Sequence, residues 1–142
     1  MPDLRCYFVT GAADSPAEVV RIAAAAARGG AGVVQVRSKP ITARDLYLLG
    51  KEVARAVAAA NPQTQVLIDD RVDVALALRH DGEPVHGVHI GQDDLPVAQA
   101  RAVLGPEAII GLTTGTRELV ENANQVADLI DYIGCCLLYT SP

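Results

Sequence analysis

The sequence contains few of the features that mark secreted or membrane proteins. Among its 142 residues there is no tryptophan, one phenylalanine and three cysteines, none of them in a CxxC pair. An odd number of unpaired cysteines is typical of a reduced intracellular chain rather than of a disulfide framework. No apolar run approaches the roughly 18 residues of a membrane helix, and the first residues lack the charge and apolar length of a secretory signal. These absences predict a cytoplasmic protein without a membrane partner.

Positive charge is also scarce. The chain has 12 Lys and Arg residues against 17 Asp and Glu residues, which gives a formal net charge of −5. This balance argues against binding of nucleic acid or anionic lipid through bulk charge. With 50% hydrophobic and 20% charged residues, the composition is that of one ordinary globular domain. Such a domain buries enough surface to fold without a disulfide or a structural metal.

What the sequence does have is a regular alternation of short β-branched runs and longer alanine-rich segments. A spacing of about 25 residues between the runs is that of a βα unit rather than of a hairpin. Candidate strands lie at residues 5–10, 32–37, 65–69, 87–91, 108–112 and 131–134. Candidate helices lie at residues 15–28, 42–60, 71–80, 97–104 and 116–129. The pattern predicts an α/β fold with parallel strands.

Two architectures accommodate such alternation, an open doubly wound sheet and a closed eight-stranded barrel. Six units fall short of eight, and a complete barrel takes about 250 residues. Chain length by itself therefore favours the open sheet.

A polar cluster follows the second candidate strand. Alternation along a strand puts Gln35, Arg37 and Lys39 on one face, opposite Val34 and Val36. The carboxyl ends of strands bind ligands in both architectures, and neighbouring cations there suit a phosphate or a pyrophosphate. The alternative is a solvated strand end with two surface cations.

Two acidic pairs follow the next two candidate strands, Asp69 with Asp70 and Asp93 with Asp94. Asp70 and Asp94 are each explained on their own as helix caps. On neighbouring strand ends beside Arg37, however, the pairs fit a divalent ion that bridges a diphosphate, since Mg²⁺ takes one or two carboxylates together with phosphate oxygens. A weaker candidate is the hydroxyl-rich segment 111–116, which ends the fifth strand and opens a helix.

Three stretches, in this order, resemble the thiamine-phosphate synthase family of (βα)₈ barrel enzymes: residues 35–39, 68–75 and 87–96. The resemblance extends from Tyr7 to Gly134 and implies an incomplete TIM-type barrel with about six of eight βα units, in place of the open sheet. It also implies an enzyme that joins hydroxymethylpyrimidine diphosphate to a thiazole phosphate and releases pyrophosphate. The partners expected are therefore small-molecule substrates.

The resemblance assigns roles to individual residues by position. It implies that Gln35, Arg37 and Lys39 hold the pyrimidine diphosphate, and that Asp70 and Asp94 are the Mg²⁺ carboxylates. In this chemistry the diphosphate departs with its charge neutralised by the metal and by basic side chains. The thiazole nitrogen then captures the pyrimidine-methyl cation. Because stabilisation of a leaving group suffices, no side chain is expected to act as a general acid or base.

Two further positions are expected to contact the pyrimidine substrate. Thr113 falls where the family usually has a serine, so a hydroxyl is retained. Asp69 falls where many members have asparagine, so the acceptor oxygen is retained and the amide donor is not.

The sequence departs from the family pattern after Gly134. The family continues into a loop with glycine-proline, threonines and a lysine, whereas residues 135–142 here do not match it. We therefore expect a partial synthase domain over residues 1–134, a non-matching tail over 135–142, and a C-terminally truncated chain that is inactive alone. Unpaired first and sixth strands would make a homo-oligomer possible.

Three other interpretations remain open at this point. A thiazole tautomerase of the same fold relies on a histidine after the fifth strand, where this chain has Gly115. A receiver-like signalling module places its acidic pair after the first strand, where this chain has Thr10, Gly11 and Ala12. The third is a remnant that binds diphosphate without turning it over.

Overall fold

The computed structural model describes residues 1–13 and 15–135. Six parallel strands form one sheet in the order β1-β2-β3-β4-β5-β6. The strands are β1 (Tyr7–Val9), β2 (Val33–Val36), β3 (Gln65–Asp69), β4 (Gly87–Ile90), β5 (Ile109–Thr113) and β6 (Tyr132–Gly134). The helices are α1 (Pro16–Arg28), α2 (Ala43–Ala60), α3 (Val72–His80), α4 (Val97–Leu104), α5 (Arg117–Ala123) and the 3₁₀ helix η1 (Asn124–Leu129).

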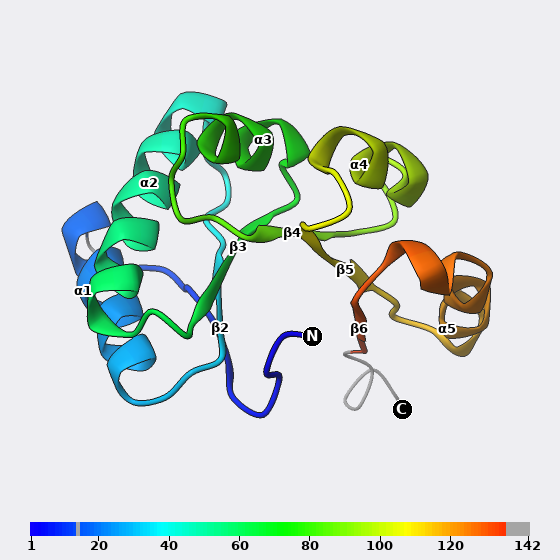
Figure 1. Cartoon of the computed structure of the whole chain (residues 1–142), viewed down its shortest axis with the longest axis horizontal. Coiled ribbons are helices and arrows are strands. Elements are labelled where there is room, and N and C mark those ends of the chain that lie inside the picture. The colour runs from blue at the N-terminus through cyan, green and yellow to red at the C-terminus, as the bar shows by residue number, and fades with distance from the viewer. Residues whose placement is uncertain (14, 136–142) are drawn as a thin grey trace.

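The sheet curls into an open crescent, with the helices along its convex side and the N-terminus toward its open side (Figure 1). Each crossover joins sequential neighbours, and because such crossovers are right-handed, every helix falls on the same face of the sheet. This is the winding of a TIM-type barrel, which confirms a partial barrel of about six βα units. The open doubly wound sheet favoured by chain length is wrong, and a receiver-like module, which needs helices on both faces, is excluded with it.

Strand alternation separates the core from the concave face. Val34, Val36 and Ile68 are fully buried and belong to the core between the strands and the helices, and burial of each such side chain stabilises the fold by about 1.5–3 kcal/mol. The residues that alternate with them, such as Gln35 and Asp69, face the concave side and line a cavity there. In the part of the chain that the structure describes, none of the helices combines the length and hydrophobicity needed to cross a bilayer.

The observed boundaries differ from the expected ones at several elements. The first strand is shorter than residues 5–10, and β5 extends one residue further than expected, to Thr113. The helix expected over 116–129 is broken into α5 and η1, with a kink at Val126 (φ −120°, ψ 20°). Asn122 and Asn124 flank the break, and asparagine weakens a helix because its side chain competes for backbone hydrogen bonds.

Candidate functional site

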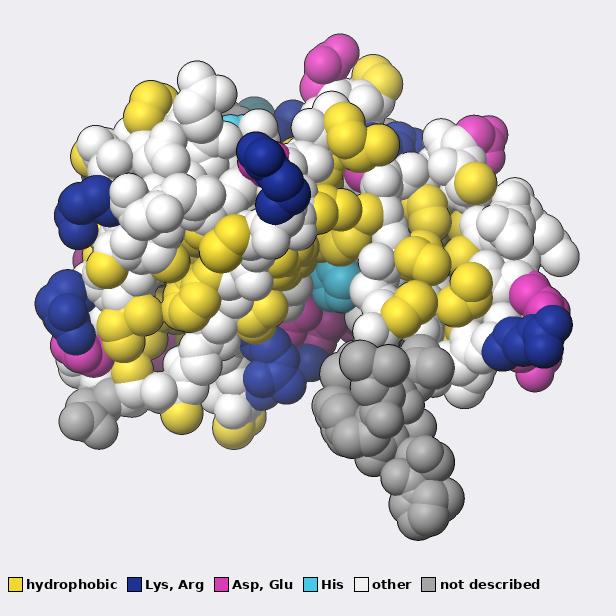
Figure 2. Space-filling view, turned by 90° about the horizontal axis from the view of Figure 1, so that it is seen from below, with side chains coloured by type: hydrophobic (Ala, Val, Ile, Leu, Met, Phe, Trp, Pro, Cys, Tyr) yellow, Lys and Arg dark blue, Asp and Glu magenta, His cyan; other side chains and the backbone are white. Residues whose placement is uncertain are grey.

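The carboxyl ends of the strands meet at one cavity of about 580 Å³ on the concave side of the sheet. All seven residues singled out from the sequence line this cavity: Gln35, Arg37, Lys39, Asp69, Asp70, Asp94 and Thr113. Seen from the open side, a histidine and acidic side chains lie at the centre of this face, with basic side chains beside them (Figure 2). The residues predicted from separate strands are therefore brought together in one place.

A second cavity, of about 540 Å³, adjoins the first at the amino ends of α2 and α3. The two cavities share Lys39, Asp69, Asp70 and Asp94. These four charged groups therefore lie between the two cavities.

Asp69 is the most buried charged group of the site, with a side chain only 8% exposed. Its Oδ2 lies 3.6 Å from Arg37 Nε and 3.6 Å from Lys39 Nζ. Neither distance is that of a hydrogen bond, so Oδ2 is a buried oxygen without a hydrogen-bond partner. Burial, and then the neighbouring charge of Asp70, raise the pKa of Asp69 to about 6. Such an oxygen is costly unless a donor or a cation meets it.

Asp70 has a left-handed backbone, with φ +65°. It does not cap α3, whose N-cap is Arg71 with no side-chain hydrogen bond, so the capping explanation is wrong for this residue. The Asp70 carboxylate instead forms an ion pair with Lys39. Burial opposes ionisation of Asp70, but the hydrogen bond from Lys39 and the interaction with Asp94 outweigh it and lower the pKa of Asp70.

Asp94 does not cap a helix either, since the N-cap of α4 is Pro96. Its Oδ2 accepts a hydrogen bond from the backbone N–H of Gly91, 2.7 Å away, which fixes the carboxylate in the loop after β4. Burial raises the pKa of Asp94, and the interaction with Asp70 raises it further. Close to Asp70, this carboxylate would be stabilised in its charged form by a cation between the two.

The donor set fits one kind of metal site. Within the described residues, no group of three or more His, Cys, Asp or Glu side chains is arranged to hold a metal. A pair of carboxylates is instead the set that Mg²⁺ uses when phosphate oxygens and water complete its shell. The buried oxygen of Asp69 without a hydrogen bond, and the neighbouring carboxyls of Asp70 and Asp94, are consistent with a cation there.

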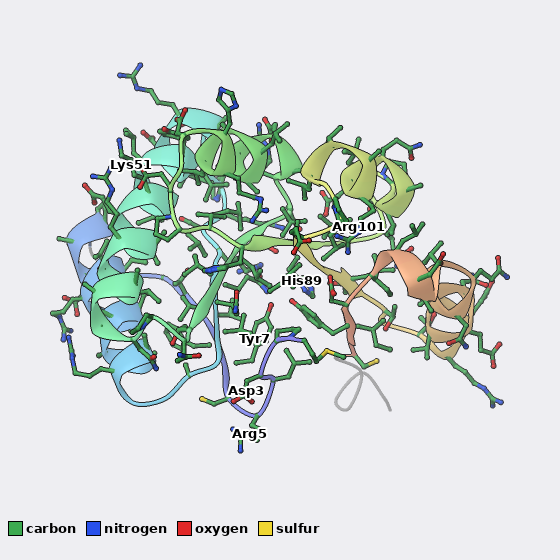
Figure 3. All side chains as sticks on the ribbon, in the orientation of Figure 1. Asp3, Arg5, Tyr7, Lys51, His89 and Arg101 are labelled. Atoms are coloured by element: carbon green, nitrogen blue, oxygen red, sulfur yellow. The ribbon has the colours of Figure 1, made fainter. Side chains whose placement is uncertain are left out.

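The structure adds three residues that the sequence did not single out, namely Tyr7, His89 and Tyr132. His89 lines the cavity, and its Nε2 lies 2.8 Å from Thr113 Oγ1. Figure 3 shows Tyr7 and His89 on the concave side of the sheet. The alternation that put Gln35 and Asp69 on this face also puts His89 there, since Asp69 pairs with His89 in register. Only the pairing between strands makes this relation visible.

The chain resembles known proteins in both sequence and structure. A family model described as thiamine monophosphate synthase matches residues 6–142. Thiamine-phosphate synthase of Corynebacterium efficiens is 65% identical over 133 residues, covering 94% of this chain and 60% of the relative. The enzyme of the same name from Natronomonas pharaonis is 39% identical, covering 96% of this chain and 60% of the relative.

A solved structure repeats this relationship. Thiamine phosphate pyrophosphorylase from Pyrococcus furiosus superposes with a TM-score of 0.77 at 28% identity, over 96% of this chain and 61% of that protein. The chain thus spans about 60% of the length of the curated relatives it matches. With the family model aligned from Cys6 onward and the same strand order observed, the chain belongs to the thiamine monophosphate synthase family.

Proposed function

We propose that this chain carries the pyrimidine-diphosphate and Mg²⁺ site of a thiamine-phosphate synthase. The whole enzyme would join hydroxymethylpyrimidine diphosphate to a thiazole phosphate and release pyrophosphate. The observation that carries the proposal is the convergence of two cations and three carboxylates, from three neighbouring strand ends, on one cavity.

The charges of the site suit a departing diphosphate. Arg37 and Lys39 are about half exposed, so their charged ends reach the cavity, and each forms an ion pair with the buried Asp69. A ligand phosphate would draw Lys39 from its ion pair with Asp70, and Arg37 offers paired donors to phosphate oxygens. Both cations would stabilise negative charge that develops on the leaving group.

Asp70 and Asp94 are the residues proposed to hold Mg²⁺. They lie in the loops after β3 and β4 and line the same cavity as the two cations. The ion, when bound, supplies neutralisation of the diphosphate charge. Because Lys39 pairs with Asp70, metal binding would free this lysine for the phosphate.

Gln35 on β2 and Thr113 on β5 supply further polar groups to the cavity. We propose that they contact the same substrate. No residue is assigned as a general acid or base, because a stabilised leaving group requires none. Gly115, at the position where a tautomerase would need a histidine, supports synthase chemistry.

The remaining expectations stay predictions. They are a partial barrel domain over residues 1–134, a non-matching tail over 135–142, a cytoplasmic location, a possible homo-oligomer and inactivity of these 142 residues alone. Of the tail, residues 136–142 lie outside the described part of the chain.

Titration calorimetry with hydroxymethylpyrimidine diphosphate, in the presence and absence of Mg²⁺, tests the proposal. We expect Mg²⁺ to strengthen binding to the wild type, and Asp94→Asn to abolish that effect. Asp128→Asn, an exposed carboxylate outside the cavity, is the matched control and should behave like the wild type. Equal, metal-independent binding by wild type and Asp94→Asn would contradict the metal site. Absence of binding by the wild type would contradict the substrate site.

A further inference from the structure

A continuous chain of hydrogen bonds crosses the concave face beneath the cavity. Gln35 Nε2 donates to the Tyr7 hydroxyl at 2.7 Å, and this hydroxyl lies 2.5 Å from that of Tyr132. The Tyr132 hydroxyl lies 2.8 Å from His89 Nδ1. His89 Nε2 in turn lies 2.8 Å from Thr113 Oγ1. The two ends of the chain, Gln35 and Thr113, are both proposed substrate contacts.

The direction of proton donation along this chain of hydrogen bonds is set at its Gln35 end. An amide nitrogen donates and does not accept, and Tyr132 is the other hydrogen-bond neighbour of the Tyr7 hydroxyl within the described residues, so the single Tyr7 proton goes to Tyr132. The Tyr132 hydroxyl, which accepts from Tyr7, has His89 Nδ1 as its other neighbour there and donates its own proton to that nitrogen. An imidazole that accepts at Nδ1 carries its proton on Nε2. That proton is donated to Thr113 Oγ1, and the hydroxyl proton of Thr113 is left for another acceptor.

Packing holds the middle of the chain in place. The rings of His89 and Tyr132 stack with centroids 5.5 Å apart, and Tyr7 meets Tyr132 edge to face at 5.7 Å. The Tyr132 ring occupies space that only a glycine at position 111 leaves open, since a Cβ there would lie 2.1 Å from Tyr132 Cζ. Rings fixed in this way allow the hydrogen bonds one geometry.

We propose that Tyr7 and Tyr132 are positioning residues that hold His89 as the neutral imidazole with its proton on Nε2. Thr113 thereby becomes a hydrogen-bond donor toward the cavity. Its ligand partner is an atom that accepts and carries no proton, such as a diphosphate oxygen or an unprotonated ring nitrogen. This last statement about the ligand rests on the proposed function, whereas the direction of proton donation along the hydrogen bonds does not.

The opposite arrangement of protons is well defined, which makes the inference testable. With an acceptor at position 35, Tyr7 would donate to it, Tyr132 would donate to Tyr7, and His89 would donate from Nδ1 to Tyr132. Thr113 would then donate to His89 and have no proton left for a ligand. The two directions therefore predict opposite tautomers of one histidine.

The experiment is ¹⁵N NMR of the histidine rings in the ligand-free protein, at about pH 8, where an imidazole is neutral. We expect the wild type to give the Nε2–H tautomer for His89, and Gln35→Glu, which only accepts, to give the Nδ1–H tautomer. Tyr132→Phe interrupts the series of hydrogen bonds between Tyr7 and His89 and should give a mixture of the two His89 tautomers. Tyr47→Phe, which removes a surface hydrogen bond to Asp81, is the control and should retain the wild-type tautomer. A wild-type His89 with its proton on Nδ1, or one unaffected by Gln35→Glu, overturns the proposal.

A second measurement tests the consequence for the ligand. Thr113→Ser retains the donor, so Thr113→Val should bind hydroxymethylpyrimidine diphosphate roughly tenfold more weakly than Thr113→Ser. Equal binding by the serine and valine variants overturns the donor role of Thr113. Because the tautomer is measured without ligand, failure of the wild type to bind the diphosphate contradicts the proposed function alone.

Discussion

The guanidinium of Arg101 and the carboxylate of Asp131 join the fourth and sixth units of the barrel, with Nη2 and Oδ2 3.1 Å apart. The same guanidinium donates to the carbonyls of Leu129, Gly105 and Ala108. The same carboxylate oxygen accepts the backbone N–H of Ile110 at 2.8 Å. Only 17% of the Arg101 side chain is exposed, so little water replaces these contacts.

Replacement of Arg101 should therefore destabilise the C-terminal end of the sheet. Arg101→Met retains the aliphatic part but removes the donor of three carbonyls and the positive partner of the Asp131 carboxylate, which costs roughly 2–3 kcal/mol. Urea unfolding measures the loss. The control is Arg117→Met, whose ion pair with Glu121 is exposed and contributes about 0.5 kcal/mol or less. Equal losses in the two variants would contradict the anchoring role of Arg101.

A methyl group at position 111 should disturb both stability and the site. The Cβ of Gly111→Ala would lie 2.1 Å from Tyr132 Cζ, so the ring must move away from His89. Overpacking of this kind costs roughly 1–3 kcal/mol. Gly115→Ala, in the following loop, meets no atom within 4 Å and should unfold like the wild type. Thermal unfolding of the two variants tests the difference, and an unperturbed Gly111→Ala would contradict the observed packing.

The charged part of the site could be predicted from the sequence because it lies at strand ends that alternation locates. Gln35, Arg37 and the acidic pairs each follow a recognisable strand, and parallel strands bring their carboxyl ends to one edge. The barrel winding, by contrast, depends on strand order, which local patterns do not encode. For this reason chain length pointed to the wrong architecture until the motifs of the family were considered.

The inner hydrogen-bonded chain could not be predicted in the same way. Tyr7 and Tyr132 are 125 positions apart, and each is an ordinary strand aromatic when taken alone. Their contact depends on sheet curvature and on the space left by Gly111. The left-handed backbone of Asp70 was also hidden, because an aspartate before a helix normally caps it.

Stability should fall below neutral pH in part through His86. Its Nδ1 accepts the backbone N–H of Val66 at 2.9 Å. Burial, and then the charge of Arg79, lower the pKa of His86 below its ordinary 6.5. Between the lowered pKa and 6.5 the unfolded chain binds more protons than the folded one, so the free energy of unfolding decreases as the pH falls through this window.

Urea unfolding of wild type and His86→Gln, measured from neutral to mildly acidic pH, isolates this contribution. Asp69 and His89 also titrate, but they are common to both proteins. The wild type should lose more stability than His86→Gln as the pH falls, and His80→Gln, at an exposed position, should follow the wild type. Parallel curves for wild type and His86→Gln would exclude the effect.

Substitutions at Asp70 should separate stability from metal binding. Its φ of +65° is strained for most residues and unstrained for glycine, while asparagine tolerates it. Asp70→Gly should therefore be more stable than Asp70→Ala by about 1 kcal/mol, since relief of left-handed strain outweighs the greater chain entropy of glycine. Loss of the half-exposed Lys39 ion pair is common to both variants and contributes little.

Asp70→Asn should unfold close to the wild type, and all three variants should lose the effect of Mg²⁺ on diphosphate binding. If Asp70→Ala proved as stable as Asp70→Gly, the backbone would not be strained there, and if Asp70→Asn retained the Mg²⁺ effect, Asp70 would not hold the metal.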